Sequence, residues 1–182
     1  MISRDEALKL VKENVDNQNL IKHMLACEVC MKELAKHFKE DQEEWALAGL
    51  LHDLDYKETF KDPQKHGFIT VEKLKDLDVT KNILDSILAH PGHKEREKLI
   101  EKVLFSVDPL TGLIVAAALM HPEKKISKID TEFVLRRFKE KRFAAGANRE
   151  QIQMIEETGL KLEEFVNICL ESMKSISEDL GL

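Results

Sequence analysis

An adjacent histidine–aspartate pair, His52 and Asp53, follows the apolar run of residues 47–51. Neighbouring residues on a helix point about 100° apart but lie at nearly the same height. Both can therefore reach one metal ion beside the helix if other helices complete its ligand set. A buried imidazole and carboxylate are otherwise costly. The alternative is that the two side chains satisfy one another or a nearby backbone group.

Four further side chains that can bind metal lie on separate predicted elements. His23 lies early in a predicted helix, and Asp108 directly precedes a proline. The residue before proline is biased away from helical backbone, so we expect Asp108 at a helix junction. His66 is expected to open a helix and His90 to close one. Solvated histidines also occur at helix ends, so neither His66 nor His90, taken alone, is identified as a metal ligand.

The residue types define the chemistry of such a site. Imidazole and carboxylate ligands suit Mn²⁺, Fe²⁺, Zn²⁺, Ni²⁺ or Mg²⁺, and the absence of thiolate disfavours a structural zinc cage. A metal ion with an open position lowers the pKa of bound water to about 7, which makes hydroxide available. Two ions about 3.5–4 Å apart would clamp the attacking and leaving oxygens of a displacement. Asp53 is the expected bridge, because a carboxylate has two oxygens.

Capping residues and apolar spacing of 3.6 residues predict that helices position these side chains. Ser3 and Glu6 form a capping-box pattern, and Asp41 is the expected cap of the helix that leads to His52. Residues 56–65 are predicted as a loop, and no segment alternates as a strand would. The predicted helices span about residues 3–15, 19–38, 41 onward, 66–75, 81–89, 95–107, 110–120, 130–143, 148 onward, and 160 to the last residue.

The composition fits one helix-rich soluble domain. Of 182 residues, 43% are hydrophobic and 34% charged, with only 7 Gly and 4 Pro. The net charge of −6 disfavours nucleic acid as a partner. The first residues are charged, unlike a signal peptide, and the low-charge run 110–120 is shorter than the roughly 20 residues of a membrane span. Three cysteines indicate a reducing compartment, so we expect a cytoplasmic protein without membrane contact.

The order of these residues resembles the signature of the HD-domain family of metal-dependent phosphohydrolases. That signature is a histidine, an adjacent His–Asp pair after an apolar helix, and a distant aspartate. Residues 66–74 and 87–90 look like the third and fourth histidine segments of members that hold two metals. Residues 110–114 and 143–149 also look like segments of a bacterial subgroup of predicted HD hydrolases. The resemblance covers about residues 20–120.

The resemblance implies an all-α, HD-domain-like helical bundle formed by residues 1–182 as one domain. Helices 130–182 would pack on the motif core. One or two divalent transition-metal ions are implied, and Asp53 and Asp55 are the expected catalytic residues, Asp55 as a ligand's partner or proton acceptor. The expected ligands of the first ion are His23, His52, Asp53 and Asp108, and those of the second are His66 and His90.

One departure from the family concerns members that open cyclic dinucleotides. Those members carry a Gly-Tyr-Pro signature and a lysine shortly after the His–Asp pair. Here Asp55-Tyr56-Lys57 follows, without that motif. Cleavage of cyclic dinucleotides is therefore not expected.

Two other features have both a structural and a functional interpretation. Cys27 and Cys30 form a single CxxC pattern within an amphipathic helix, which favours small core residues over a zinc site. Basic residues between 136 and 142 favour a solvated helix face. The functional alternative is that one of them, or Arg149, holds a phosphate.

We therefore expect a phosphohydrolase that cleaves a phosphoester of a small nucleotide or related phosphorylated metabolite with metal-bound hydroxide. One alternative is a metal-stabilised nucleotide-binding or regulatory module without turnover. Another is a di-iron oxygenase of the same fold, since a fold does not fix its reaction. The sequence leaves the substrate, the metal and the oligomeric state open.

Overall fold

The computed structural model describes all 182 residues and contains helices but no strand, which confirms the all-α prediction. The α-helices are α1 (Arg4–Asn14), α2 (Gln18–Phe38), α3 (Gln42–Leu51), α4 (Tyr56–Thr59), α5 (Phe68–Leu74), α6 (Lys81–Ala89), α7 (Leu99–Met120), α8 (Thr131–Lys139), α9 (Arg149–Gln153), α10 (Leu162–Ser175) and α11 (Ser177–Leu180). Short 3₁₀ helices are η1 (Pro63–Lys65), η2 (Ile126–Lys128) and η3 (Met154–Thr158).

Side-chain caps begin the first three helices. Ser3 and Glu6 form the predicted capping box of α1. Asp41 accepts hydrogen bonds from two backbone N–H groups in the first turn of α3, as predicted, and Asn17 does the same for α2. The helices that carry His23 and lead to His52 therefore start where local hydrogen-bonding chemistry places them.

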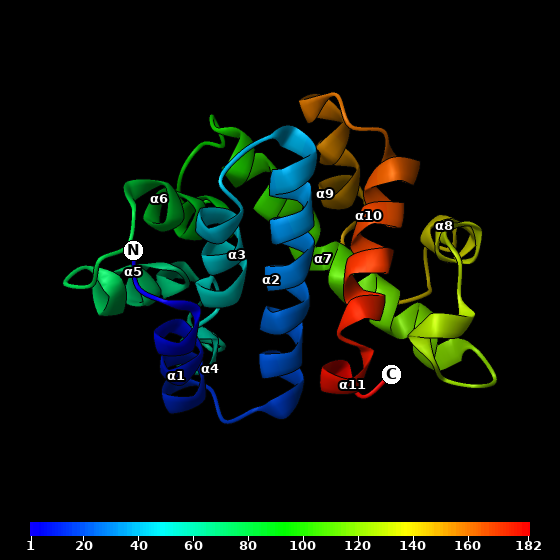
Figure 1. Cartoon of the computed structure of the whole chain (residues 1–182), viewed down its shortest axis with the longest axis horizontal. Coiled ribbons are helices and arrows are strands. Elements are labelled where there is room, and N and C mark those ends of the chain that lie inside the picture. Colours follow the sequence, from blue (N-terminus) through cyan, green and yellow to red (C-terminus); the bar gives the residue numbers. More distant parts are fainter.

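Helix α2 is the centre of the bundle. Figure 1 shows it lengthwise in the middle, with α3 and α10 packed against it and α7 crossing behind. Helix α3 approaches α2 closely at Gly49, where an added Cβ would meet the Cys27 carbonyl oxygen at 2.6 Å. Glycine thus permits the backbone contact that brings the end of α3 beside His23.

The segment 56–65 is not the simple loop that the sequence predicts. It contains α4 and η1, because the carbonyl of Asp55 accepts the backbone N–H groups of Glu58 and Thr59, each at 2.9 Å. The hydroxyl of Thr59 donates to the same carbonyl at 2.9 Å. These local bonds form one helical turn that apolar periodicity does not reveal.

The predicted break before Pro109 is wrong, and Asp108 lies inside one continuous helix, α7. A proline within a helix lacks the N–H that would bond the carbonyl four residues earlier, here that of Phe105. The Gln151 side-chain amide donates to this carbonyl at 2.7 Å. A residue 46 positions away thus replaces the missing helical hydrogen bond.

Helix α7 is therefore longer than the predicted low-charge run 110–120. By length and composition it could cross a membrane, with a mean hydropathy of 2.0 in its most apolar stretch. However, 56% of that stretch is buried inside the bundle, as in a core helix. Towards the C-terminus, the helix predicted over 130–143 ends at Lys139, and the last predicted helix is divided into α10 and α11.

Candidate metal centre

Four histidines surround the carboxylate of Asp53. Its Oδ2 atom lies 3.7 Å from His23 Nε2 and 3.5 Å from His52 Nε2. Its Oδ1 atom lies 3.2 Å from His66 Nε2 and 3.5 Å from His90 Nε2. One carboxylate therefore stands between two pairs of imidazoles, with one oxygen turned to each pair.

The other ring nitrogen of each of two buried histidines is fixed by the backbone. His52 Nδ1 donates to the Gly49 carbonyl at 2.8 Å, and His90 Nδ1 donates to the Ile87 carbonyl at 2.7 Å. A bonded Nδ1–H leaves the lone pair of a neutral imidazole on Nε2. Both rings therefore present an electron-pair donor to the centre.

Thr111 gives His23 the same orientation and links it to Asp108. The Thr111 hydroxyl donates to the Asp108 carbonyl at 2.9 Å, so its oxygen accepts from His23 Nδ1 at 3.0 Å. His23 Nε2 then lies 3.2 Å from Asp108 Oδ1. Helices α2 and α7 thus bring one imidazole and one carboxylate to the His52 side of the centre.

Asp55 positions His66. Its Oδ1 atom accepts from His66 Nδ1 at 2.7 Å, and its Oδ2 atom accepts the backbone N–H groups of Gly67 and Thr70 at 2.8 and 2.9 Å. Asp55 is fully buried, and both oxygens are engaged. The predicted catalytic residue Asp55 is therefore placed as a positioning residue, whereas Asp53 lies at the centre itself.

Gly67 brings the elements that carry His66 and His90 together. Its φ of +82° favours glycine, and an added Cβ would meet the Ile87 carbonyl oxygen at 2.8 Å. The start of α5 thereby approaches α6, and His66 Nε2 comes within 3.0 Å of His90 Nε2. The His66-Gly67 phrase in the sequence thus has a direct structural reason.

The protein environment shifts the pKa values of these groups in opposite directions. Burial lowers the pKa of His52 to about 4, which keeps its ring neutral. Burial opposes charge on His66 as well, but Asp53 and Asp55 outweigh it and raise its pKa to about 10. Burial would raise the pKa of Asp53, yet the surrounding histidines hold it well below its usual value.

The donor set fits a bound divalent metal ion. His52 Nε2 is buried and has no hydrogen-bond partner. A buried nitrogen in that condition is costly unless something within the site binds it. A lone pair opposite an ionised carboxylate is the arrangement that a cation satisfies. His52, Asp53 and His90 have ligating atoms within 4.8 Å of one another, close enough for a shared ion.

The six predicted ligands all reach this centre, but they form two groups around Asp53. On one side are His23, His52 and Asp108, and on the other are His66 and His90. Two of these five side chains come from α2 and α7, and the other three belong to the residues that directly follow α3, η1 and α6. His66 therefore does not open a helix as predicted, because α5 begins two residues later, at Phe68. Asp53 therefore lies between the two groups of side chains.

Cys27 and Cys30 do not share one candidate metal site. Cys27 Sγ lies 3.8 Å from His23 Nε2, and the ligating atoms of His23, Cys27 and His52 lie within 4.8 Å of one another. Cys30 Sγ instead donates to the Cys169 carbonyl at 3.6 Å. Both thiols are buried. Burial raises the pKa of Cys27, which favours the neutral thiol over the thiolate that binds metal.

A pocket of about 540 Å³, here called the metal pocket, opens over the centre. Asp53, Asp108 and His23 are in its wall, and no lysine or arginine is. The segment 143–149 contributes to the wall but does not supply a cation. The guanidinium of Arg149 donates to backbone carbonyls at Ala144 (2.7 Å) and Ala147 (2.6 Å), and so holds the segment in place.

The basic residues near the end of α8 have partners of their own. Arg136 pairs with Glu132 at 3.2 Å, and Arg137 pairs with Glu140 at 2.9 Å. Neither arginine lines the metal pocket. These two arginines therefore fit the predicted solvated helix face better than a phosphate-binding role.

Two residues that support the centre were not identified from the sequence. Thr111 orients His23, and Gln151 completes the hydrogen bonding of the helix that carries Asp108. Thr111 lies in the segment 110–114 that resembles the bacterial HD subgroup, which was the available signal. Nothing in the sequence around Gln151 links it to Phe105.

Comparison with known proteins agrees with this geometry. The chain matches the protein-family model described as HD domain over residues 20–130, which is more than half of its length. No curated protein matches it, and no solved structure does. The matched range contains all six side chains of the centre, and members of the family are mostly metal-dependent hydrolases. This chain belongs to the HD-domain family.

Proposed function

We propose that the protein is a metal-dependent phosphohydrolase that cleaves a phosphoester of a small nucleotide or related phosphorylated metabolite. The observation that carries this proposal is the position of Asp53, with one oxygen turned to His23 and His52 and the other to His66 and His90. A shared carboxylate of this kind suits a centre of two metal ions that acts on phosphate.

The charge of the metal pocket supports the same assignment. Its wall contains two carboxylates, Asp53 and Asp108, and no lysine or arginine. These two carboxylates oppose the approach of a phosphate group, so added positive charge favours its binding there. When bound, divalent metal ions would offset the charge of the phosphoryl group and lower the pKa of a coordinated water to about 7.

The protein's own residues would bind and orient the reacting groups. His23, His52, Asp53 and Asp108 would hold one ion, and His66 and His90 would hold the second together with Asp53. Asp55, Thr111 and the backbone carbonyls of Gly49 and Ile87 fix the direction in which the imidazoles present Nε2. Such preorganisation reduces the reorganisation required during the reaction.

The experiment is a panel of phosphate esters offered to the full chain after chelation and after reloading with Mn²⁺, Fe²⁺, Zn²⁺, Ni²⁺ or Mg²⁺. The expected result is release of inorganic phosphate from one class of ester by a reloaded form and none by the chelated form. Asp53→Ala should be inactive with every metal. Nucleotide binding without release of phosphate would favour a regulatory module. Iron-dependent oxygen uptake would favour an oxygenase.

A further inference from the structure

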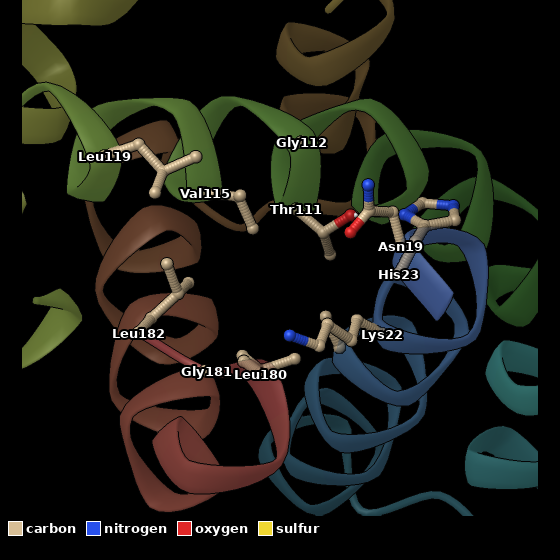
Figure 2. Close-up of a pocket in the computed structure, with 11 residues that line it drawn as sticks. Asn19, Lys22, His23, Thr111, Gly112, Val115, Leu119, Leu180, Gly181 and Leu182 are labelled. Atoms are coloured by element: carbon tan, nitrogen blue, oxygen red, sulfur yellow. Dashed lines mark hydrogen bonds between the residues drawn. The ribbon is translucent and has the colours of Figure 1, made fainter. Parts of the chain in front are cut away.

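A second cavity of about 410 Å³, here called the side pocket, lies between α2, α7 and the chain around α11. Figure 2 shows Lys22 on one wall, Val115 and Leu119 from α7 on another, and Leu182 on a third. Its lining also includes Asn19, His23 and Gly112, which line the metal pocket too. The side pocket and the metal pocket are therefore neighbours that share part of their walls.

Gly112 lies at the boundary between the two pockets, in the interior of α7. Glycine is a much poorer helix former than alanine. No packing requires glycine at this position, because an added Cβ would meet nothing within 4 Å. Its missing side chain instead leaves open space on this side of α7, between the metal pocket and the side pocket.

Lys22 supplies the positive charge that the metal pocket lacks. Figure 2 shows its ammonium group directed into the side pocket. No carboxylate lies within ion-pair distance of this ammonium, which lies 2.8 Å from the position that a Cβ on Gly181 would occupy. The ammonium is thus free to bind an anionic group of a ligand.

The rest of the wall is mainly apolar. Val115, Leu119, Leu180 and Leu182 contribute aliphatic surface. The hydroxyl of Thr111 is already used by His23 and Asp108. Lys22 and Asn19 are therefore the polar side chains left for a ligand, which is too few for a sugar with hydroxyls on all sides.

We propose that the side pocket binds the organic part of the phosphoester substrate, and that this part has an apolar body and an anionic group at its far end. The phosphate would lie in the metal pocket, the apolar body would pass Gly112, and the anionic group would pair with Lys22. This inference rests on the proposed hydrolysis of a phosphoester. It narrows the substrate class to amphipathic phosphate esters with a second negative charge.

The test uses stable phosphonates and measures binding, so that it does not depend on turnover. Methylphosphonate, hexylphosphonate and 6-phosphonohexanoate are titrated into the metal-loaded full chain by calorimetry. Hexylphosphonate should bind at least about tenfold more tightly than methylphosphonate, because its added methylene groups become buried. The terminal carboxylate of 6-phosphonohexanoate should raise the affinity severalfold further.

Two variants assign these gains to the side pocket. Lys22→Met should abolish the gain from the carboxylate and keep that from the alkyl chain, whereas Lys9→Met on α1 should change neither. Gly112→Leu should bring the ratio of hexylphosphonate to methylphosphonate affinity close to one. Its thermal unfolding midpoint should not fall, since leucine is a better helix former than glycine.

The outcomes separate this inference from the proposed function. Equal affinities for methylphosphonate and hexylphosphonate, or no binding of either, would overturn the side-pocket assignment even if some phosphate ester is hydrolysed. If 6-phosphonohexanoate still bound more tightly than hexylphosphonate to Lys22→Met, the role of Lys22 would be overturned. Chain-length-dependent binding in a protein that releases no phosphate from any ester would support the side pocket and contradict the hydrolase.

Discussion

The two halves of the metal centre are held in place by different means. His23 and Asp108 stand on α2 and α7, the long helices of the core. His66 and His90 stand instead at the ends of short elements, after η1 and after α6. His66 depends on the hydrogen bond from its Nδ1 to Asp55.

Because of this difference, substitutions in the two halves should affect fold stability and metal affinity differently. In the first half, His23 and Asp108 also depend on the packing and hydrogen bonding of the long helices α2 and α7, so the loss of those supports should destabilise the fold. Supports of the second half are local hydrogen bonds to one ligand, so their loss should weaken one ion while the bundle remains folded. The following substitutions test that distinction.

Asp53→Ala should have the largest effect, because it removes the carboxylate that both halves share. Metal content, measured by elemental analysis after reloading, should fall in both positions, and phosphate release should disappear. Far-ultraviolet circular dichroism should remain helical. If this variant retained as much metal as the unmodified chain, the shared role of Asp53 would be wrong.

His66→Ala and His90→Ala should each lower the metal content by about one ion per chain. Hydrolysis should fall about 100-fold or more, because the charge stabilisation by the second ion is lost. His93→Ala provides the matched control, since His93 packs on Phe68 with ring centroids 4.5 Å apart and lies outside the centre. Unchanged metal content in both variants would mean that His66 and His90 hold no ion and that only the first half binds metal.

Asp55→Asn should weaken the second ion without removing its ligands. The asparagine oxygen can still accept from His66 Nδ1, but the negative charge that makes the imidazole more basic is lost. Removal of such a partner lowers metal affinity by about 10–100-fold. Competition with a fluorescent chelator would measure the change, and the thermal midpoint should show whether burial of Asp55 also matters for folding.

Metal loading should release a proton from His66 at pH 8. The pKa of about 10 means that His66 is protonated in the metal-free protein at this pH, whereas a ligating imidazole must be neutral. The affinity for the second ion should therefore rise with pH and level off only near pH 10. His52, with a pKa of about 4, is already neutral and should release none. Calorimetry in buffers of different ionisation enthalpy counts the protons, and His66→Ala should reduce the count by about one.

Gln151→Ala should show the smallest effect on the centre and a measurable one on the fold. It leaves the part-buried Phe105 carbonyl without this partner, which costs about 1 kcal/mol, the lower end of the range for buried groups. Urea unfolding would measure this loss in the metal-free protein. Metal content at saturation should be unchanged. A variant that is as stable as the unmodified chain but binds less metal would contradict the claim that supports of the first half act on the fold.

The sequence predicted features that depend on near neighbours. Caps such as Ser3 and Asp41 act within one turn, so the starts of α1 and α3 are confirmed. The candidate ligands were predicted because His52 and Asp53 adjoin and the other histidines follow in a family order. Whether each side chain carries the predicted role stays a prediction until metal is measured.

Features that depend on distant residues could not be predicted. Pro109 reads as a helix break, and only the contact with Gln151 allows α7 to continue through it. The side pocket likewise depends on residues near both ends of the chain, Lys22 and Leu182. Periodicity and capping carry no information about such pairs.

The hydrogen bond from Gln151 to Phe105 also bears on the order of folding. The segment that matches the HD family ends at residue 130, yet α7 completes its hydrogen bonding only when α9 has joined it. During synthesis from the ribosome, every ligand emerges before the residue that completes the helix of Asp108. Contacts between distant residues form late, because closure of the intervening chain costs entropy. We therefore expect the helix of Asp108 to complete its hydrogen bonding only after residue 151 has been made.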